Sequence, residues 1–210
     1  MHFSDLNLNK PLLKAIFEKN YETPTKVQIQ TIPLVLAKKN VIASAQTGTG
    51  KTAAFALPIL QLLFHQQDTN KEQKKIRALI VSPTRELAVQ INEEFTDYSK
   101  YTKLSSTVVY GGISIDAQKK VLKKGIDILI ATPGRLLDLC KQEIVDLSTI
   151  EILVLDEADL MLDMGFIDDI KKIDLLCPTQ KQILLFSATM PSKVVHFAKN
   201  LLSNPEIVEV

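Results

Sequence analysis

The chain has 210 residues, of which 46% are hydrophobic, so its length and composition suit one large domain, or a domain with a short appendage, with a sizeable core. Its 25 Lys and Arg residues nearly balance its 24 Asp and Glu residues. The resulting net charge of +1 excludes a global field that attracts nucleic acid or anionic membrane, so any such binding must come from a local patch. The longest mostly apolar stretch, residues 53–64, is interrupted by Pro58 and Gln61 and is shorter than the roughly 20 residues of a membrane span.

The start of the chain and its cysteines favour a cytoplasmic protein. Residues 1–5 lack the basic region and apolar core of a secretory signal. Cys140 and Cys177 stand far apart without a CxxC context, which is typical of reduced cytosolic thiols. None of the three histidines has ligand spacing from a cysteine, so we do not expect a zinc site. We expect no membrane partner.

The first 40 residues have the apolar spacing of helices and are predicted to form a helical preface packed on the same domain. From residue 41 onward, short apolar runs alternate with segments of helical spacing. The runs expected to form strands are residues 41–43, 78–81, 107–109, 128–130, 152–155 and 183–186. Each run is continuous, which is typical of strands covered on both faces. The pattern predicts an α/β domain over residues 41–210, with a mostly parallel sheet and helices on both faces.

Residues 66–77 are polar and rich in lysine, and we expect them to form an exposed loop.

Residues 45–52 follow an expected strand and begin an expected helix, which is the context of a phosphate-binding loop. A plain strand–helix turn is the alternative. Glycines let the backbone curl so that successive N–H groups point at phosphate oxygens. The residues predicted to hold the phosphates are Gln46, Thr47, Gly48, Thr49, Gly50, Lys51 and Thr52.

Within this loop, Lys51 is expected to reach the β- and γ-phosphates and the Thr52 hydroxyl to ligate Mg²⁺. Three carboxylates then follow the apolar run 152–155, where a parallel sheet meets its ligand. We expect Asp156 to hold Mg²⁺, directly or through water. Glu157 is expected to point to the opposite side and to orient or deprotonate the attacking water. For Asp159 alone, an acidic first turn of a helix is an alternative.

Two hydroxyl residues, Ser187 and Thr189, come after the last expected strand. Taken singly, either one is better explained as a helix N-cap before Pro191. Together with Asp159 at a neighbouring strand end, they suggest a contact between hydroxyl and carboxylate. The candidate catalytic residues are therefore Lys51, Asp156, Glu157, Asp159, Ser187 and Thr189.

The chain resembles the N-terminal RecA-like domain of DEAD-box RNA helicases over essentially its whole length. The tetrapeptide at residues 156–159, Asp-Glu-Ala-Asp, gives that family its name, and the agreement extends over residues 154–166. The other matching segments are residues 45–52, 83–88, 111–112, 132–135 and 187–191. Six of the seven glycines fall inside these segments, so the resemblance is far more specific than a lone phosphate loop. It implies a RecA-like P-loop NTPase fold that uses ATP or ADP with Mg²⁺.

The segment before the first strand looks like the Q motif, with which the family recognises adenine. The resemblance implies that Phe3, Tyr21, Thr23 and Gln28 contact the adenosine part of the nucleotide. A Gln amide pairs with both N6 and N7 of adenine, so Gln28 is expected to choose ATP over GTP. Phe3 is expected to stack on the ring. The alternatives are a solvated helix residue for Gln28 and a side chain stapled to the core for Phe3.

The sequence departs from the Q motif at two positions. Asn20 stands before Tyr21 where the family usually has Gly, and Lys26 follows Thr25 where Pro is common. Neither change removes a group that is expected to contact the nucleotide.

The remaining matching segments are expected to line an RNA-binding rim of the sheet. They contain Pro83, Thr84, Arg85, Gly111, Gly112, Thr132, Pro133, Gly134 and Arg135. Exposed glycine N–H groups, a helix N-terminus and two arginines suit phosphate oxygens, so we expect binding of the backbone without sequence preference. The preference for RNA over DNA comes from the resemblance alone.

DEAD-box enzymes contain two RecA-like domains, and this chain resembles the first. An arginine finger is worth on the order of 10³ to 10⁵ in rate, and the family takes its arginine from the second domain. We therefore predict the ATP-binding half of an ATP-dependent RNA helicase, with the second domain of the parent chain as partner. The lone domain is expected to be a monomer that binds nucleotide, hydrolyses it poorly and does not unwind duplexes. The alternatives are a non-catalytic nucleotide- or RNA-binding module and a DNA-stimulated ATPase of the same fold.

Overall fold

The computed structural model describes residues 1–65 and 75–210. Over these ranges, seven strands form one sheet in the order β3-β4-β2-β5-β6-β1-β7, and every neighbouring pair is parallel. The strands are β1 (Val41–Ser44), β2 (Ala78–Val81), β3 (Ser106–Val109), β4 (Ile128–Ala131), β5 (Ile152–Leu155), β6 (Gln182–Ser187) and β7 (Glu206–Glu209). The parallel α/β architecture predicted from the sequence is confirmed.

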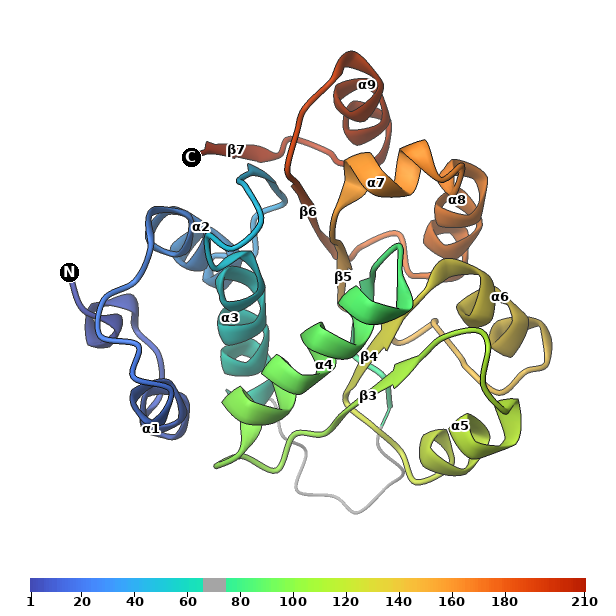
Figure 1. Ribbon diagram of the computed structural model, residues 1–210, viewed down its shortest axis with the longest axis horizontal. Helices are drawn as coiled ribbons and strands as arrows, with labels where there is room; N and C mark the ends of the chain where they lie inside the picture. The colour runs from blue at the N-terminus through green and yellow to red at the C-terminus, as the bar shows by residue number, and fades with distance from the viewer. Residues whose placement is uncertain (66–74) are drawn as a thin grey trace.

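Helices cover both faces of this sheet (Figure 1). The elements on one face are η1 (Phe3–Leu6), α1 (Lys10–Glu18), α2 (Lys26–Leu36), α3 (Lys51–His65) and α4 (Arg85–Ser99). Those on the other face are α5 (Ile115–Leu122), α6 (Pro133–Lys141), α7 (Ala158–Asp163), α8 (Ile167–Leu176) and α9 (Ser192–Leu201). The sheet is therefore the middle of three layers, as expected when consecutive parallel strands are joined by helices.

Strand residues alternate between the two cores, because successive side chains of a strand point to opposite faces. In β1, Val41 and Ala43 pack with α1–α4, whereas Ile42 packs with α5–α9. The other inner strands alternate in the same way, and both sets of side chains are buried. This double burial explains why the strands appear in the sequence as continuous apolar runs.

Two strands at the margins of the sheet differ from the expectation. β7 was not predicted, because three of its four residues are exposed and only Val208 is buried. β3 is expected to be covered on both faces, yet it is only partly buried except at Val109. Both are edge strands of the described sheet, so each has a neighbour on one side only and needs a weaker apolar pattern.

The first 40 residues contribute to the same core as the sheet. Phe3, Leu12 and Val27 belong to the cluster that contains Val41 of β1. α2 packs along α3, and α1 contacts both α3 and α4. These contacts hold the loop between α1 and α2 beside the first turn of α3, which is where the site described below lies.

The apolar stretch predicted to be too short for a membrane lies within α3. This helix is apolar on nearly all sides because it is enclosed by α2, α4 and the sheet. In the described ranges, no helix is both long enough and apolar enough to cross a bilayer. Most of the loop expected over residues 66–77 lies outside the described residues, and residues 75–77 lead into β2.

Candidate functional site

Apart from the Q motif, which precedes β1, the motifs singled out in the sequence follow the carboxyl ends of the parallel strands. The phosphate loop follows β1, the carboxylates follow β5, and Ser187 ends β6. These three strands are neighbours in the order β5-β6-β1. The candidate RNA-binding segments follow β2, β3 and β4, which are neighbours in the order β3-β4-β2. The strand order thus divides one edge into a candidate nucleotide half and a candidate RNA half, called the nucleotide half and the RNA half below.

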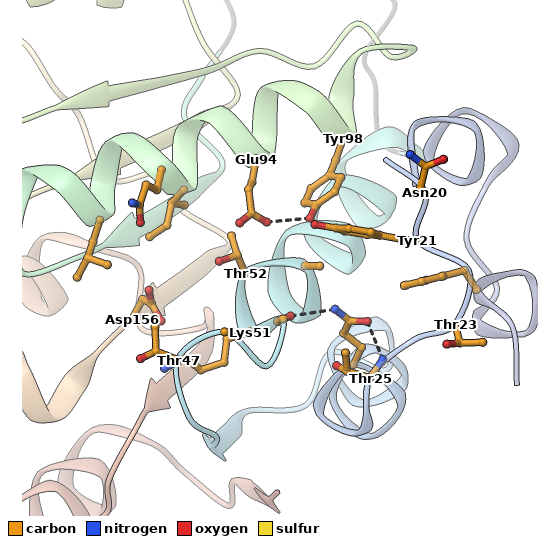
Figure 2. Close-up of a pocket in the computed structure, with 18 of the residues that line it drawn as sticks. Asn20, Tyr21, Thr23, Thr25, Thr47, Lys51, Thr52, Glu94, Tyr98 and Asp156 are labelled. Atoms are coloured by element: carbon orange, nitrogen blue, oxygen red, sulfur yellow. Dashed lines mark hydrogen bonds between the residues drawn. The ribbon is translucent and has the colours of Figure 1, made fainter. Parts of the chain in front are cut away.

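A cavity of about 690 Å³ opens at the nucleotide half (Figure 2). Its size falls in the usual range of about 300–1,000 Å³ for small-molecule sites. The predicted site residues that line it are Phe3, Tyr21, Thr23, Gln28, Thr47, Gly48, Gly50, Lys51, Thr52, Asp156 and Glu157. Those that do not line it are Gln46, Thr49, Asp159, Ser187 and Thr189. The Q motif, the phosphate loop and two carboxylates are therefore brought together.

The phosphate loop makes a side-chain hydrogen bond within itself and contacts Glu157. The Thr49 hydroxyl donates to the Gln46 carbonyl oxygen at 2.6 Å. Lys51, which begins α3, is buried and its ammonium lies 2.6 Å from Oε1 of Glu157. The Thr47 hydroxyl reaches the same carboxylate oxygen at 3.5 Å. In this state the lysine expected to meet phosphates neutralises a buried carboxylate instead.

The two adjacent carboxylates, Asp156 and Glu157, were expected on opposite sides, but both line the cavity. The reason is that β5 ends at Leu155, and Glu157 takes a left-handed conformation with φ of 55°. Strand alternation therefore does not extend to Glu157. A left-handed backbone is uncommon for a residue other than glycine and marks a constrained position.

Asp156 has the environment expected of a cation ligand. Burial raises the pKa of its carboxyl to about 7, although Lys51 acts in the opposite direction. Its Oδ1 is buried and has no hydrogen-bond partner among the described residues. An unpartnered buried carboxylate oxygen is costly, and oxygen ligands are what Mg²⁺ prefers. Asp156, together with the Thr52 hydroxyl on the same cavity, therefore fits the predicted metal role.

Gln28 is buried, so the alternative of a solvated helix residue is wrong. Its Oε1 accepts from the Thr25 backbone N–H at 2.9 Å, and its Nε2 donates to the Gly50 carbonyl at 3.1 Å. The first bond caps the start of α2, and the second ties the Q motif to the phosphate loop (Figure 2). The oxygen and the nitrogen of the amide that is expected to pair with adenine therefore each make one hydrogen bond within the chain.

The two aromatic residues of the Q motif have different exposures. Phe3 is only 5% exposed and belongs to the core, which agrees with the alternative of a side chain stapled to the core. Tyr21 is 40% exposed on the cavity wall. Its face is therefore more accessible to a flat ring than that of Phe3.

Five residues of α4 line the cavity, and sequence reasoning missed the three of them that carry a polar group. These three are Gln90, Glu94 and Tyr98, spaced four apart on one face of the helix. The Tyr98 hydroxyl donates to Glu94 at 2.8 Å, and the Tyr21 ring lies beside this pair (Figure 2). Burial, followed by the Glu94 charge, raises the pKa of the Tyr98 phenol. The i, i+4 spacing of polar residues on an amphipathic helix was the signal that could have found them.

The expected contact between hydroxyl and carboxylate is present beside the cavity. The Thr189 hydroxyl donates to Oδ2 of Asp159 at 2.7 Å, and the Thr189 backbone N–H donates to the same oxygen at 2.9 Å. The Ser187 hydroxyl accepts from the Asp159 backbone N–H at 3.1 Å and donates to the Thr189 carbonyl at 2.7 Å. These bonds connect the end of β6 to the first turn of α7.

The candidate RNA-binding segments lie together on the neighbouring half of the edge. Thr84 caps α4 by accepting from the Leu87 N–H at 3.3 Å, and Thr132 precedes α6. Gly111, Gly112 and Gly134 are exposed. Pro83 and Pro133 are buried. Pro133 occupies the first position of α6, which suits its fixed φ, so these prolines shape the segments rather than present a side chain.

The two arginines of this rim already have partners within the chain. Arg135 donates from Nη1 and Nη2 to the Ile113 carbonyl, at 3.2 Å each. The Arg85 guanidinium lies over the Tyr110 ring, 4.9 Å from its centroid. Stacking leaves the N–H groups at the edge of a guanidinium able to meet phosphate oxygens.

Comparison with known proteins places these features in a family. The family model described as DEAD/DEAH box helicase matches residues 25–197. The chain is 47% identical over 203 residues, 97% of its length, to the DEAD-box ATP-dependent RNA helicase RhpA of Helicobacter pylori, of which it covers 40%. It is 49% identical to the ATP-dependent RNA helicase CshA of Limosilactobacillus reuteri, covering 41% of that protein.

The fold is also similar to that of solved structures. The crystal structure of a DEAD box protein from Methanococcus jannaschii matches the whole chain with a TM-score of 0.92 and 40% identity, over 56% of that protein's chain. The chain thus spans about two fifths of the curated relatives that it matches. Because the family model covers most of its residues, the chain belongs to the DEAD/DEAH box helicase family.

Proposed function

We propose that this chain is the ATP-binding half of an ATP-dependent RNA helicase and binds Mg·ATP or Mg·ADP together with an RNA backbone. The carrying observation is that the cavity and the exposed glycine loops occupy adjacent halves of one sheet edge. A nucleotide and an RNA strand bound there contact loops of the same rigid sheet. The names of the relatives, all ATP-dependent RNA helicases, support the same conclusion.

In the nucleotide half, Lys51 and the backbone N–H groups of the phosphate loop bind the β- and γ-phosphates. Asp156 and Thr52 would hold Mg²⁺, and the ion would supply charge neutralisation for the phosphates. Gln28 pairs with adenine, and Tyr21 lies against the adenine ring. Phe3 belongs to the core beneath this part of the cavity. Once Lys51 turns to the phosphates, Glu157 is released to accept a proton from the attacking water. Asp159, Ser187 and Thr189 hold α7 against β6 near these groups.

The lone chain is proposed to hydrolyse ATP very poorly and not to unwind duplexes. Of the described residues, Lys51 is a cation on the cavity wall and no arginine lines it. An arginine that stabilises the transition state must therefore come from elsewhere, and we propose the second RecA-like domain of the parent chain. The thiols of Cys140 and Cys177 are unpaired, which supports a reducing cytoplasmic location. We propose that the lone domain is a monomer.

Calorimetric titration of the chain with Mg·ADP and Mg·GDP tests the nucleotide part of this proposal. We expect Mg·ADP to bind more tightly, and Gln28→Ala to abolish the preference. Gln142→Ala is the matched control, because the side chain of this exposed glutamine, at the C-terminal end of α6, donates to Asp138 and does not line the cavity formed by the described residues. Equal binding of both nucleotides would overturn the role of Gln28. Absence of binding by the wild type would overturn the proposal that this chain binds nucleotide without a second domain.

Titration with single-stranded RNA and DNA of the same sequence tests the RNA part. We expect RNA to bind and its affinity to fall with salt, because phosphate contacts dominate. Equal affinity for DNA would favour a DNA-stimulated ATPase of this fold. Absence of binding to either would leave only the nucleotide part of the proposal.

A further inference from the structure

The loop of residues 110–114, between β3 and α5, is held by side chains from three other elements. The Gln118 amide of α5 donates to the Tyr110 carbonyl at 3.1 Å. Arg135 of α6 donates twice to the Ile113 carbonyl, and Arg85 of α4 stacks on the Tyr110 ring. The loop is thus anchored at both ends by groups that converge from separate helices.

Between these two anchors stand Gly111 and Gly112, which are exposed. A Cβ built on either glycine meets no atom within 4 Å, so both face open space. Gly112 has φ of +86°, a conformation that the anchors must maintain because glycine is otherwise free to leave it. Two unhindered peptide groups held in one conformation are suited to receive a phosphate.

The polar side chain of Gln118 is unfavourable for stability at its buried position. The residue is 6% exposed, and its Oε1 is buried without a hydrogen-bond partner among the described residues. An unsatisfied buried acceptor is destabilising, and an apolar side chain of the same shape avoids that loss. Among the described residues, the hydrogen bond that the Gln118 amide makes is to the carbonyl of Tyr110, which precedes the two glycines, so we attribute the presence of this polar residue to that bond.

We infer that Gln118 is a positioning residue that holds Gly111 and Gly112 in the conformation that binds the RNA backbone. The inference rests on the proposed RNA binding and deepens it. Gln118 itself does not touch RNA, since its side chain is buried behind the loop. Arg85 and Arg135 are exposed enough to do both, anchoring the loop and meeting phosphates.

The test compares Gln118→Met with the wild-type chain. Methionine has a similar length and removes both the donor bond and the unpartnered acceptor, so the midpoint of thermal unfolding is expected to change little. Gln182→Met is the matched control, because this buried glutamine also donates to backbone carbonyls, those of Val35 and Lys39, but at the amino end of β6. Binding of labelled single-stranded oligouridine is measured by fluorescence anisotropy, and Mg·ADP binding by calorimetry.

We expect Gln118→Met to weaken RNA binding by about three- to tenfold, as for loss of one net hydrogen bond, and to leave Mg·ADP affinity unchanged. The slope of log K against log salt is expected to stay the same, because no phosphate contact is removed. Arg85→Met, in contrast, is expected to reduce that slope, because a cation is lost. Gln182→Met is expected to lower the unfolding midpoint without a selective effect on RNA.

A nuclear magnetic resonance spectrum of the free variant adds a readout that does not depend on RNA. We expect the amide signals of Gly111 and Gly112 to shift or broaden in Gln118→Met while those of the phosphate loop stay in place. Unchanged glycine signals, or RNA affinity equal to that of the wild type, would overturn the inference and leave the proposed RNA binding intact. Absence of RNA binding by the wild type would overturn both. Parallel losses of RNA and Mg·ADP affinity would mean that Gln118 is merely structural.

Discussion

The ammonium of Lys51 and the carboxylate of Glu157 are 2.6 Å apart, although the two residues are separated by 106 positions in the chain. Each side chain is at most 10% exposed, so the pair is shielded from water. A buried ion pair of this kind is weak support for stability, but removal of one partner leaves an uncompensated charge. A nucleotide that needs Lys51 must first compete with Glu157.

Lys51→Ala is therefore expected to abolish measurable nucleotide binding and also to destabilise the chain. Loss of a partner from a buried pair costs about 3–5 kcal/mol, which chemical denaturation detects. Calorimetry with Mg·ADP measures the binding. Affinity equal to that of the wild type would discredit the assignment of the phosphate loop.

Glu157→Gln is expected to keep or tighten nucleotide binding, because the neutral amide holds Lys51 less strongly. In a protein that contains both RecA-like domains, the same change is expected to abolish hydrolysis, because the amide cannot accept the proton of the attacking water. Calorimetry and an ATPase assay measure the two effects. If binding collapses instead, Glu157 is a structural group or a metal ligand.

Gly50→Ala is expected to disrupt the phosphate loop through a specific neighbour. A Cβ at Gly50 comes within 2.3 Å of Gln28 Nε2, and φ at this position is +88°. Gly48 has almost the same φ of +86° but open space around a Cβ, so Gly48→Ala is the control for backbone strain alone. We expect Gly50→Ala to lower the unfolding midpoint and ADP affinity more than Gly48→Ala.

Gly50→Ala is expected to lower the free energy of unfolding more than Gly48→Ala does. This difference is expected to become smaller when Gln28→Ala is also present, because the side-chain amide that clashes with the new Cβ is then absent. A double-mutant cycle on the free energy of unfolding measures this coupling. Strict additivity of the two changes would show that the contact between Gln28 and the phosphate loop does not matter for stability.

The raised pKa of Asp156, about 7, predicts that the metal-free chain loses stability as pH rises. Between the usual pKa of 3.8 and about 7, the unfolded carboxyl has released its proton while the folded one retains it. The contribution of this group is therefore complete below the usual pKa and is lost as pH passes through the folded pKa. Asp156→Asn removes this dependence.

We expect the unfolding midpoint of Asp156→Asn, measured in chelator, to match that of the wild type near pH 4 and to exceed it near pH 8. Parallel profiles for the two proteins would mean that Asp156 ionises near its usual pKa. Mg²⁺ affinity of the wild type is expected to weaken below pH 7, where a proton competes for the carboxylate.

Thr189→Val is expected to raise the pKa of Asp159. Although partial burial acts in the opposite direction, the Thr189 hydroxyl holds the pKa of this carboxyl below its usual value. A carboxyl whose pKa is lowered in the folded state stabilises the protein at pH values above its usual pKa. This stabilisation is lost as the pH falls through the pKa of the folded state. The variant is therefore expected to lose about 0.5–1 kcal/mol near pH 7, a small amount because the carboxylate is only partly buried.

Titration of Asp159 by nuclear magnetic resonance measures this shift. Ser187→Ala serves for comparison, because the Ser187 hydroxyl also lowers the pKa of Asp159, but less than the Thr189 hydroxyl does. We expect a smaller rise in the Asp159 pKa for Ser187→Ala. An equal rise in both variants would show that the carboxylate responds to movement of α7 rather than to one donor.

The sequence determined the local features of this protein, because they depend on residues that are near each other in the chain. The departures from the Q motif illustrate this. Asn20 has φ of 56°, a left-handed position that suits Gly or Asn. Lys26 is the first residue of α2, where Pro is favoured but not required. Continuous apolar runs likewise predicted five strands that are buried on both faces.

Only the tertiary structure decided which of these local features meet. It paired Lys51 with Glu157, placed Glu94 and Tyr98 on the cavity wall, and used both ends of the Gln28 amide. β7 escaped prediction because a mostly exposed edge strand needs little apolar pattern. Such contacts depend on the order of the strands in the sheet and on the left-handed turn at Glu157, and neither is encoded by the spacing of neighbouring residues.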